Sequence, residues 1–128
     1  MMKNSLHKDI WIDAPVERVF ACFTDEKSML SWHGKEVELD PRPGGIYKVV
    51  FENGTTILGE YKEVQLNERV VYSAKYGEVE SLISIEFLSK NGGTRLILHQ
   101  DFDPTLDTSS FNEGWDYFLD LLVTKIGK

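Results

Sequence analysis

The chain has 128 residues, with 14 Lys and Arg against 21 Asp and Glu, so its net charge is −7 and its isoelectric point is near 4.9. The content of 41% hydrophobic and 27% charged residues argues against intrinsic disorder. The negative charge argues against a nucleic-acid partner, because phosphate binding needs clustered Lys and Arg. The lone Cys22 excludes a disulfide framework and a thiolate metal cage, and its apolar neighbours indicate a small core residue.

The sequence shows neither a targeting segment nor a break between domains. No apolar run follows Lys3, and no stretch approaches the roughly 18 apolar residues that a membrane-spanning helix needs. We therefore expect no signal peptide, no membrane span and a cytoplasmic location. No repeat, low-complexity tract or Ser/Gly-rich linker divides the chain, so we expect a single domain over 1–128.

The first third of the chain predicts one strand and two short helices. A β-prone segment at 10–12 is followed by Pro15, whose missing N–H suits the start of a helix. Apolar residues then recur at helical spacing over 16–23, which predicts the first helix. Thr24 or Asp25 can cap a second short helix directly after it.

From Lys35 onward the apolar period changes to two, which predicts strands. The sequence Asn53-Gly54 is a strong hairpin signal, since both residues tolerate positive φ. Six further strands are predicted, at about 35–40, 46–52, 56–64, 70–76, 81–88 and 94–102.

The last segment predicts one long helix. Ser110 and Glu113 have the spacing of a capping box, which satisfies free N–H groups at a helix start. The helix ends at Gly127 and carries an apolar stripe of Phe111, Trp115, Leu119, Leu122 and Ile126. A run of strands with helices at the ends of the chain is typical of an α+β fold, in which one face of an antiparallel sheet covers the long helix.

The motifs resemble a known superfamily in their order and spacing. Residues 12–20, with the sequence IDAPVERVF, followed by Thr24 and Asp25, resemble the opening of the SRPBCC (START-like) superfamily. Within it, the chain resembles the branch of the activator of heat-shock-protein-90 ATPase homologue, in its C-terminal domain. Five further blocks agree: Trp32 with Gly34, Arg42-Pro43-Gly44-Gly45, Gly59 with Glu63-Val64, Gly92-Gly93-Thr94-Arg95-Leu96, and Gly114-Trp115 with Leu119.

The resemblance implies a helix-grip fold, in which a curved antiparallel sheet wraps a long C-terminal helix and two short helices follow the first strand. It also implies a cavity between helix and sheet, which relatives commonly use for apolar ligands. Two positions depart from the pattern: many relatives carry a second Trp where this chain has His33, and many carry a His near Gln100. Roles that relatives assign to those two side chains therefore do not transfer to this chain.

Strand alternation predicts which side chains face the long helix. We expect an apolar pocket with a few polar handles, because Tyr carries a large apolar body with a hydroxyl at its tip. The alternative is that most of these side chains only pack the core. In that case the tyrosines and Gln100 are the residues that we expect to line a pocket. The candidate ligand-binding residues are Trp32, Tyr47, Phe51, Tyr61, Tyr72, Tyr76, Ile85, Leu98, Gln100, Trp115, Leu119 and Leu122.

Two polar residues lie close to this predicted pocket. The Gln100 amide sits on an otherwise apolar face and needs a partner, which could be a ligand or a buried water. We expect instead a hydrogen bond to a neighbouring Tyr hydroxyl. His33 could be a polar contact or a pH-sensitive gate at the cavity mouth, but we expect a surface histidine at a helix end.

The residue types that carry catalysis or bind metals form no recognisable constellation. His99 and Asp101 share one strand face with Arg95, but this face is opposite to the apolar one, so we expect a solvated charge cluster rather than an acid–base pair. His7, His33 and His99 lack the spacing of zinc ligands, and no nucleophile elbow is present. We therefore assign no catalytic residue, no metal site and no cofactor.

Three functions remain open. The first is a small-molecule-binding module, with a hydrophobic or lipid-like ligand held by apolar burial. The second, motivated by the resemblance, is a co-chaperone-like protein-interaction module whose acidic surface steers toward a basic patch on its partner. The third is a cyclase- or hydratase-type enzyme, which would need an enclosed acid or base that the sequence does not identify. We expect an apolar small molecule or a protein as partner, no nucleic acid, and a monomer or weak homodimer.

Overall fold

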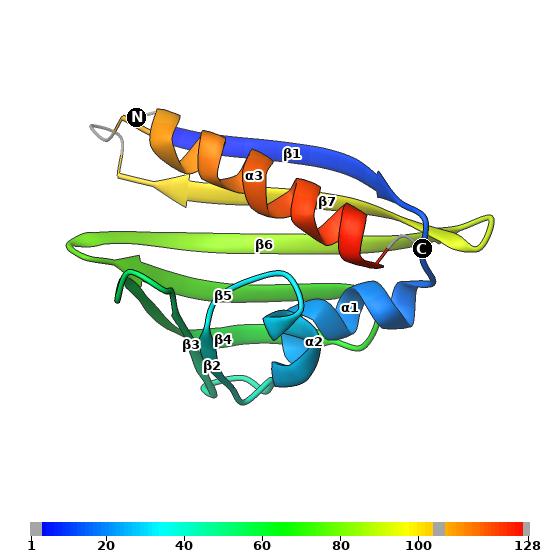
Figure 1. The fold of residues 1–128 in the computed structure, drawn as a ribbon, viewed down its shortest axis with the longest axis horizontal. Helices are drawn as coiled ribbons and strands as arrows, with labels where there is room; N and C mark the ends of the chain where they lie inside the picture. Colours follow the sequence, from blue (N-terminus) through cyan, green and yellow to red (C-terminus); the bar gives the residue numbers. More distant parts are fainter. Residues whose placement is uncertain (1–3, 104–106, 127–128) are drawn as a thin grey trace.

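The computed structural model describes residues 4–103 and 107–126 of the chain. Its strands are β1 (Asn4–Ile12), β2 (Glu36–Leu39), β3 (Ile46–Val50), β4 (Thr56–Gln65), β5 (Arg69–Tyr76), β6 (Val79–Lys90) and β7 (Gly93–Phe102). Its helices are α1 (Val16–Thr24), α2 (Glu26–Leu30) and α3 (Ser109–Ile126) (Figure 1). The predicted order of one strand, two short helices, six strands and one long helix is confirmed.

The seven strands form one open sheet in the order β1-β7-β6-β5-β4-β3-β2, and every neighbouring pair is antiparallel. In Figure 1 the sheet curves around the helices; α3 packs against β1, α1 against β6 and β7, and α2 against β2. All three helices therefore cover the same face of the sheet. The predicted α+β helix-grip fold is confirmed.

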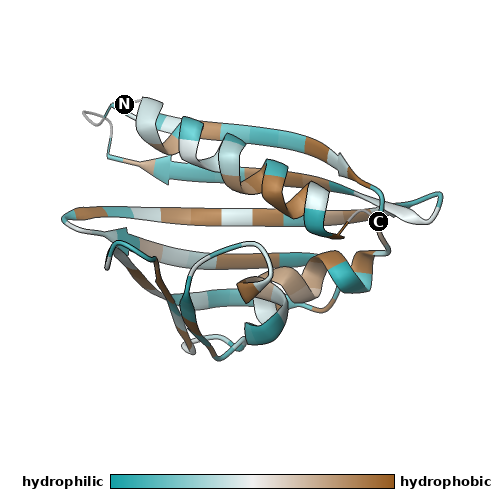
Figure 2. Ribbon diagram, viewed as in Figure 1, coloured by the Kyte–Doolittle hydropathy of each residue, from teal (hydrophilic) through white to brown (hydrophobic). Residues whose placement is uncertain are grey.

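Strand alternation separates a covered face from an exposed one. Along β7 the side chains of Leu96, Leu98 and Gln100 are buried against the helices, whereas Arg95 at the start of this run is exposed. Figure 2 shows the same alternation as hydrophobic and hydrophilic bands along the strands. The period of two in the sequence thus predicts correctly which residues face α3.

The first strand is longer than predicted. It begins at Asn4, and its pairing with β7 runs from Asn4 opposite Phe102 to Ile12 opposite Thr94. The sequence signal fails over 4–9 because β1 is an edge strand whose outward residues are polar, so only Leu6 in this stretch is buried. The backbone hydrogen bonds to β7 extend β1 over residues whose hydrophobic pattern does not predict a strand.

The helix starts refine the sequence interpretation. Asp25 caps α2, because its carboxylate accepts a hydrogen bond from the Ser28 N–H at 3.0 Å, whereas the Thr24 hydroxyl donates to the Phe20 carbonyl. The predicted capping box of the long helix is wrong. Since α3 begins at Ser109, Ser110 lies inside its first turn, and the Asp107 carboxylate accepts from the Ser109 N–H at 3.0 Å. The predicted end at Gly127 lies outside the described residues.

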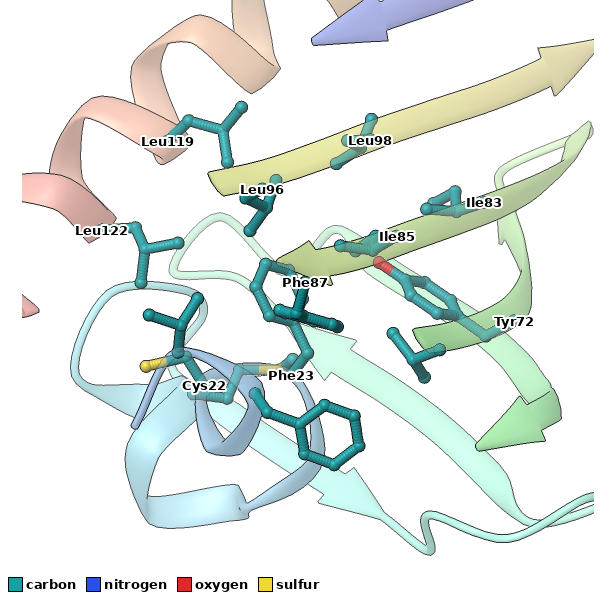
Figure 3. Packing of buried hydrophobic residues seen from close by; sticks show 14 of the residues in the cluster. Cys22, Phe23, Tyr72, Ile83, Ile85, Phe87, Leu96, Leu98, Leu119 and Leu122 are labelled. Carbon is teal, nitrogen blue, oxygen red and sulfur yellow. The ribbon is translucent and has the colours of Figure 1, made fainter. Parts of the chain in front are cut away.

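At one end of the molecule, α1 and the last turns of α3 pack against the sheet and form a filled core. Leu119 and Leu122 point from α3 toward Leu96 and Phe87 of the sheet (Figure 3), and Phe23 of α1 belongs to the same core cluster. The rings of Phe23 and Phe87 lie 5.7 Å apart at 63°, an edge-to-face contact that aromatic pairs prefer. Cys22 is buried here as predicted, and burial raises the pKa of its thiol to about 11, so the thiol stays protonated.

A candidate ligand-binding cavity

A cavity of about 660 Å³ lies between α3 and the sheet. Its wall is built from α3, the turn after α2, the β3–β4 hairpin, and strands β5, β6 and β7. Seven of the twelve candidate residues line it, namely Trp32, Tyr47, Phe51, Tyr72, Tyr76, Gln100 and Trp115. Strand alternation and helical spacing therefore bring most of the candidates to one place, although their role in binding stays a prediction.

The remaining five candidates lie outside the cavity wall. Tyr61, Ile85, Leu98, Leu119 and Leu122 are at most 4% exposed and belong to the packed core. The strand residues Tyr61, Ile85 and Leu98 lie on the helix-covered face as predicted, but the space in front of them is filled by α1 and by the last turns of α3, which carry Leu119 and Leu122. Their place in the core was not evident from the sequence, because the facing pattern of a strand or helix does not show where along it the space is occupied, and their role in binding stays a prediction.

Tyr47 and Tyr72 form the floor where the cavity meets the core, and Tyr61 packs against them from the core side. The rings of Tyr47 and Tyr72 stack with centroids 4.0 Å apart, and their hydroxyl oxygens are 3.4 Å apart. The Tyr61 hydroxyl donates to the Phe23 carbonyl at 2.8 Å, and this hydrogen bond connects α1 to the sheet. Burial raises the pKa of the Tyr47 and Tyr72 hydroxyls, so both remain neutral and add no charge to the floor.

Gln100 connects the long helix to the sheet. Its Oε1 accepts a hydrogen bond from Trp115 Nε1 at 2.7 Å, and its Nε2 donates to Ser81 Oγ at 2.8 Å. The expected Tyr partner is wrong. Gln100 is paired with Ile83, and Ser81 is two residues along β6 on the same face, so Ser81 lies diagonally within reach. Both ends of the amide are satisfied by protein, and the hydrogen bond fixes Trp115 at the cavity wall.

His33 is buried, not exposed as expected. Only 5% of the residue is exposed, and it lines the cavity from the turn after α2. Burial lowers the pKa of its imidazole to about 3, so the ring is neutral. Among the described residues, no hydrogen-bond partner reaches its Nδ1.

A local turn explains the inward direction of His33. Helix α2 ends at Leu30, and the next residues turn the chain with Trp32 buried and Gly34 at φ +83°. A Cβ on Gly34 would lie 2.6 Å from Val49 Cγ1, so the turn can pack against β3 only with glycine there. The one sequence signal for a buried His33 is the resemblance, since relatives carry a large apolar Trp at this position.

Several lining residues were not among the candidates. They include Phe111 and Phe118 of α3, Ser81 and Ile83 of β6, Ala74 of β5, and Gly114 in the middle of α3. Phe118 lies next to the apolar stripe of α3 and widens it, and this feature of the sequence indicates that Phe118 faces the sheet. For Gly114 the sequence offers no signal, because an absent side chain leaves no hydrophobic pattern.

Charge is confined to the edge of the cavity. Of the described lining residues, Glu52 and Lys125 carry charge, and both are exposed. The interior is bounded by aromatic and aliphatic surfaces, with His33 and the tyrosine hydroxyls as neutral polar groups. Such a site suits an uncharged, largely apolar molecule.

The charge cluster predicted on the outer face of the sheet is found there. His99 Nε2 lies 2.9 Å from Asp101 Oδ1, and the side chain of His99 is 45% exposed. Arg95 pairs with Asp9 on the neighbouring strand, and the hydrogen bond between them lowers the pKa of the Asp9 carboxyl. These groups point away from the cavity and are solvated, as expected for surface pairs.

Two features are missing from residues 4–103 and 107–126. No group of three or more His, Cys, Asp or Glu side chains that could hold a metal ion occurs there. In the same stretches, no helix is both long and apolar enough to cross a membrane.

The fold has many counterparts among solved structures. A protein from Chromobacterium violaceum (CV1439) is 23% identical, with 98% of each chain covered and a TM-score of 0.85. CalU16 from Micromonospora echinospora is also 23% identical, with 97% of this chain and 76% of CalU16 covered and a TM-score of 0.82. An Hsp90 activator from Plasmodium falciparum is 25% identical, with 91% of each chain covered and a TM-score of 0.77.

The comparison with families supports the resemblance seen in the motifs. Among curated proteins, none gives a significant match to the chain. The family described as "Activator of Hsp90 ATPase homolog 1-like protein" matches residues 13–127, which is nearly the whole chain. The chain therefore belongs to the family of Activator of Hsp90 ATPase homolog 1-like proteins.

Proposed function

We propose that this protein is a binding module for an uncharged, hydrophobic small molecule, held in the cavity between α3 and the sheet. The observation that carries the proposal is the cavity itself, about 660 Å³ in volume and walled by aromatic side chains. Small-molecule sites are concave, mostly apolar and typically about 300–1,000 Å³. The module would be one domain over 1–128, acting in the cytoplasm.

The size of the cavity argues against a simple packing fault. Protein interiors are packed like organic crystals, and voids larger than a water molecule are few. Here the first half of α3 borders the space with partly exposed Phe111, Trp115 and Phe118. The hydrogen bond from Trp115 to Gln100 holds one of these rings in a defined position at the wall. A defined aromatic wall around open space is what a ligand site requires.

Binding would be driven by apolar burial. A ligand that buries about 250 Å² of apolar surface gains about 6 kcal/mol at roughly 25 cal/mol per Å². Loss of translational and rotational freedom opposes this gain, so we expect affinities in the micromolar to millimolar range for unoptimised compounds. That range can be measured by titration.

The test is an amide NMR titration with pools of uncharged apolar metabolites and lipids. We expect shifts concentrated at Tyr47, Tyr72, Gln100 and Trp115. A well-dispersed spectrum with no shifts for any pool would overturn the proposal and direct the search to protein partners.

A matched pair of leucine variants links the shifts to the cavity. Gly114 lines the cavity, and a Cβ at this position would have nothing within 4 Å, so Gly114→Leu should place a side chain into open space and block binding. Glu113→Leu adds the same side chain one residue earlier, at an exposed position away from the lining, and should leave binding unchanged. Equal binding by both variants would place the ligand elsewhere.

A co-chaperone role is the second candidate, and family membership is the observation that favours it. The Plasmodium falciparum relative is an Hsp90 activator, and the present chain carries a net charge of −7 that would steer it toward a basic surface. A pull-down with Hsp90 at low salt tests this role, and the captured amount should fall as salt rises. Absence of the chaperone at low salt would exclude it.

A further inference from the structure

His33 is enclosed by four aromatic rings. It stacks on Trp32 at 4.6 Å between ring centroids and 19° between planes, and lies nearly parallel to Trp115 at 6.3 Å and 15°. The rings of Phe51 and Phe118 meet it edge-on, with centroids at 5.0 and 4.4 Å. These neighbours come from the turn after α2, the end of β3 and the first half of α3, so they surround the imidazole from several sides.

The imidazole has hydrogen-bonding capacity that the protein does not use. A neutral imidazole carries one N–H donor and one acceptor nitrogen. Among the described residues, no partner reaches Nδ1, and the four rings around it present carbon faces and edges. Buried polar groups are nearly always hydrogen-bonded, so an orphaned nitrogen needs an explanation. His33 also lines the cavity, so a molecule bound there is a candidate partner for the imidazole.

The tyrosine pair on the floor has a spare donor as well. Tyr47 and Tyr72 share one hydrogen bond between their hydroxyl oxygens at 3.4 Å. Two hydroxyls carry two O–H donors, and one hydrogen bond uses only one of them. Both residues line the same cavity as His33. The wall therefore offers two neutral, underused hydrogen-bonding groups within a largely apolar surface.

We propose that His33 is a specificity-determining residue that selects a hydroxyl-bearing, uncharged aromatic ligand. A hydroxyl both donates and accepts, so it can satisfy the imidazole in either tautomer, whereas a carbonyl can only accept. The aromatic part matches the rings that flank His33, Trp115 and Phe118 among them. A carboxylate is disfavoured, because none of the described interior lining residues is a cation and Lys125 stands at the exposed edge. This inference rests on the proposed ligand-binding function.

Three related probes separate the parts of this inference. Naphthalene is purely apolar, 2-naphthol adds one neutral hydroxyl, and 2-naphthoate adds a negative charge to the same ring system. By NMR titration at neutral pH, we expect 2-naphthol to bind about tenfold tighter than naphthalene, as one good hydrogen bond to a buried group allows. We expect 2-naphthoate to bind no better than naphthalene.

Two histidine variants assign the preference to His33. In His33→Phe the ring is kept and the nitrogens are removed, so naphthalene should still bind and the tenfold advantage of 2-naphthol should fall to below about threefold. His99→Phe makes the same change on the exposed outer face and should keep the advantage. If His33→Phe does not fold, the imidazole ¹⁵N shifts of the unmodified protein decide, and these should move with 2-naphthol but not with naphthalene.

The outcomes distinguish the two levels of the argument. If none of the three probes binds although a compound of the metabolite and lipid pools does, the role of His33 fails and the cavity function stands; if neither the probes nor the pools bind, both fail. If naphthalene and 2-naphthol bind equally well, or if the advantage of 2-naphthol survives in His33→Phe, the cavity function stands and the specificity role is overturned. Unchanged imidazole ¹⁵N shifts on saturation with 2-naphthol would overturn it as well.

Discussion

The two halves of α3 lie over the same sheet but meet different surroundings. In the second half, Leu119, Leu122 and Ile126 are buried in a filled core. In the first half, Phe111 and Trp115 are partly exposed and border a cavity of about 660 Å³, and beside the buried leucines of the second half Phe118 and Leu121 continue its wall. Apolar residues follow α3 along its whole length, so the helix pattern alone does not decide which of them border the cavity. The position of α1 decides it, because α1 packs between α3 and the sheet at one end of the molecule only (Figure 1).

The side-chain chemistry of the two ends differs in the same way. The filled end is built mainly from Leu, Ile and Phe, which have no polar atoms to satisfy. The hollow end combines Phe, Ile and Leu with Tyr, Trp, His and Gln, whose polar tips either pair within the protein or stay unpaired. Good packing at the filled end stabilises the fold. The hollow end can therefore contain polar groups that a filled core would exclude. Four predictions test this division, beginning with the largest expected effect.

Adjacent leucines on α3 give the sharpest test. Leu122 is fully buried at the filled end, so Leu122→Ala should lower the free energy of unfolding by about 2–5 kcal/mol, because the neighbours cannot collapse into the space. Leu121 borders the cavity and is only partly buried, so Leu121→Ala should cost less than about 1 kcal/mol. Urea denaturation measures both. Equal losses would show that the two ends are packed alike.

Acid should weaken the hollow end through His33. Its pKa is about 3 in the folded protein against 6.5 for an ordinary histidine, so the unfolded chain binds the proton more tightly between these values. Stability is then complete above about pH 6.5 and falls with acidification, by roughly 2 kcal/mol between pH 6.5 and about pH 5. Unfolding followed across this range should show the loss in the unmodified protein.

The control for this prediction is His33→Phe, in which the loss over the same range should be smaller by that amount. An unchanged pH profile in the variant would assign the acid sensitivity to other groups. The filled end behaves in the opposite sense. The Cys22 thiol has a pKa of about 11 against 9.0, so its contribution to stability is lost only as the pH rises above 9.

The hydrogen bond between Gln100 and Trp115 is the third test. Gln100→Leu leaves Trp115 Nε1 without its acceptor, and we expect a loss of about 1–3 kcal/mol in the free energy of unfolding. Trp115→Phe made in addition removes the orphaned donor, so the double variant should be more stable than the sum of the single changes predicts. Strict additivity in this double-mutant cycle would contradict the assigned role of the pair.

Sequence patterns predict the direction of side chains better than the space in front of them. Alternation along the strands places Tyr47, Tyr72 and Gln100 on the helix-facing side, and all three line the cavity. The same rule places Ile85 and Leu98 on that side, yet they lie in the filled core. The difference depends on where α1 packs, which is a tertiary contact that no period of two or 3.6 encodes.

Two misjudged residues have local causes. A helix end usually faces water, which predicts an exposed His33, but α2 stops at Leu30 and the turn carries the next residues inward. Proximity on the sheet predicts a tyrosine partner for Gln100, but its partners come from a diagonal strand position and from α3. Both errors concern polar residues at the hollow end, where hydrogen-bond partners are set by geometry across elements rather than by sequence spacing.

The smallest expected effect comes from Gly114, in the middle of α3. A Cβ there meets nothing within 4 Å, so Gly114→Ala adds no clash and reduces the freedom of the unfolded chain. We expect a gain of about 0.5–1 kcal/mol in the free energy of unfolding, measured by urea denaturation. At a filled position the added methyl would meet neighbours, so a loss of stability on Gly114→Ala would mean that the space beside α3 is closed in solution. A gain in stability, with ligand binding retained, would instead support an open cavity beside α3.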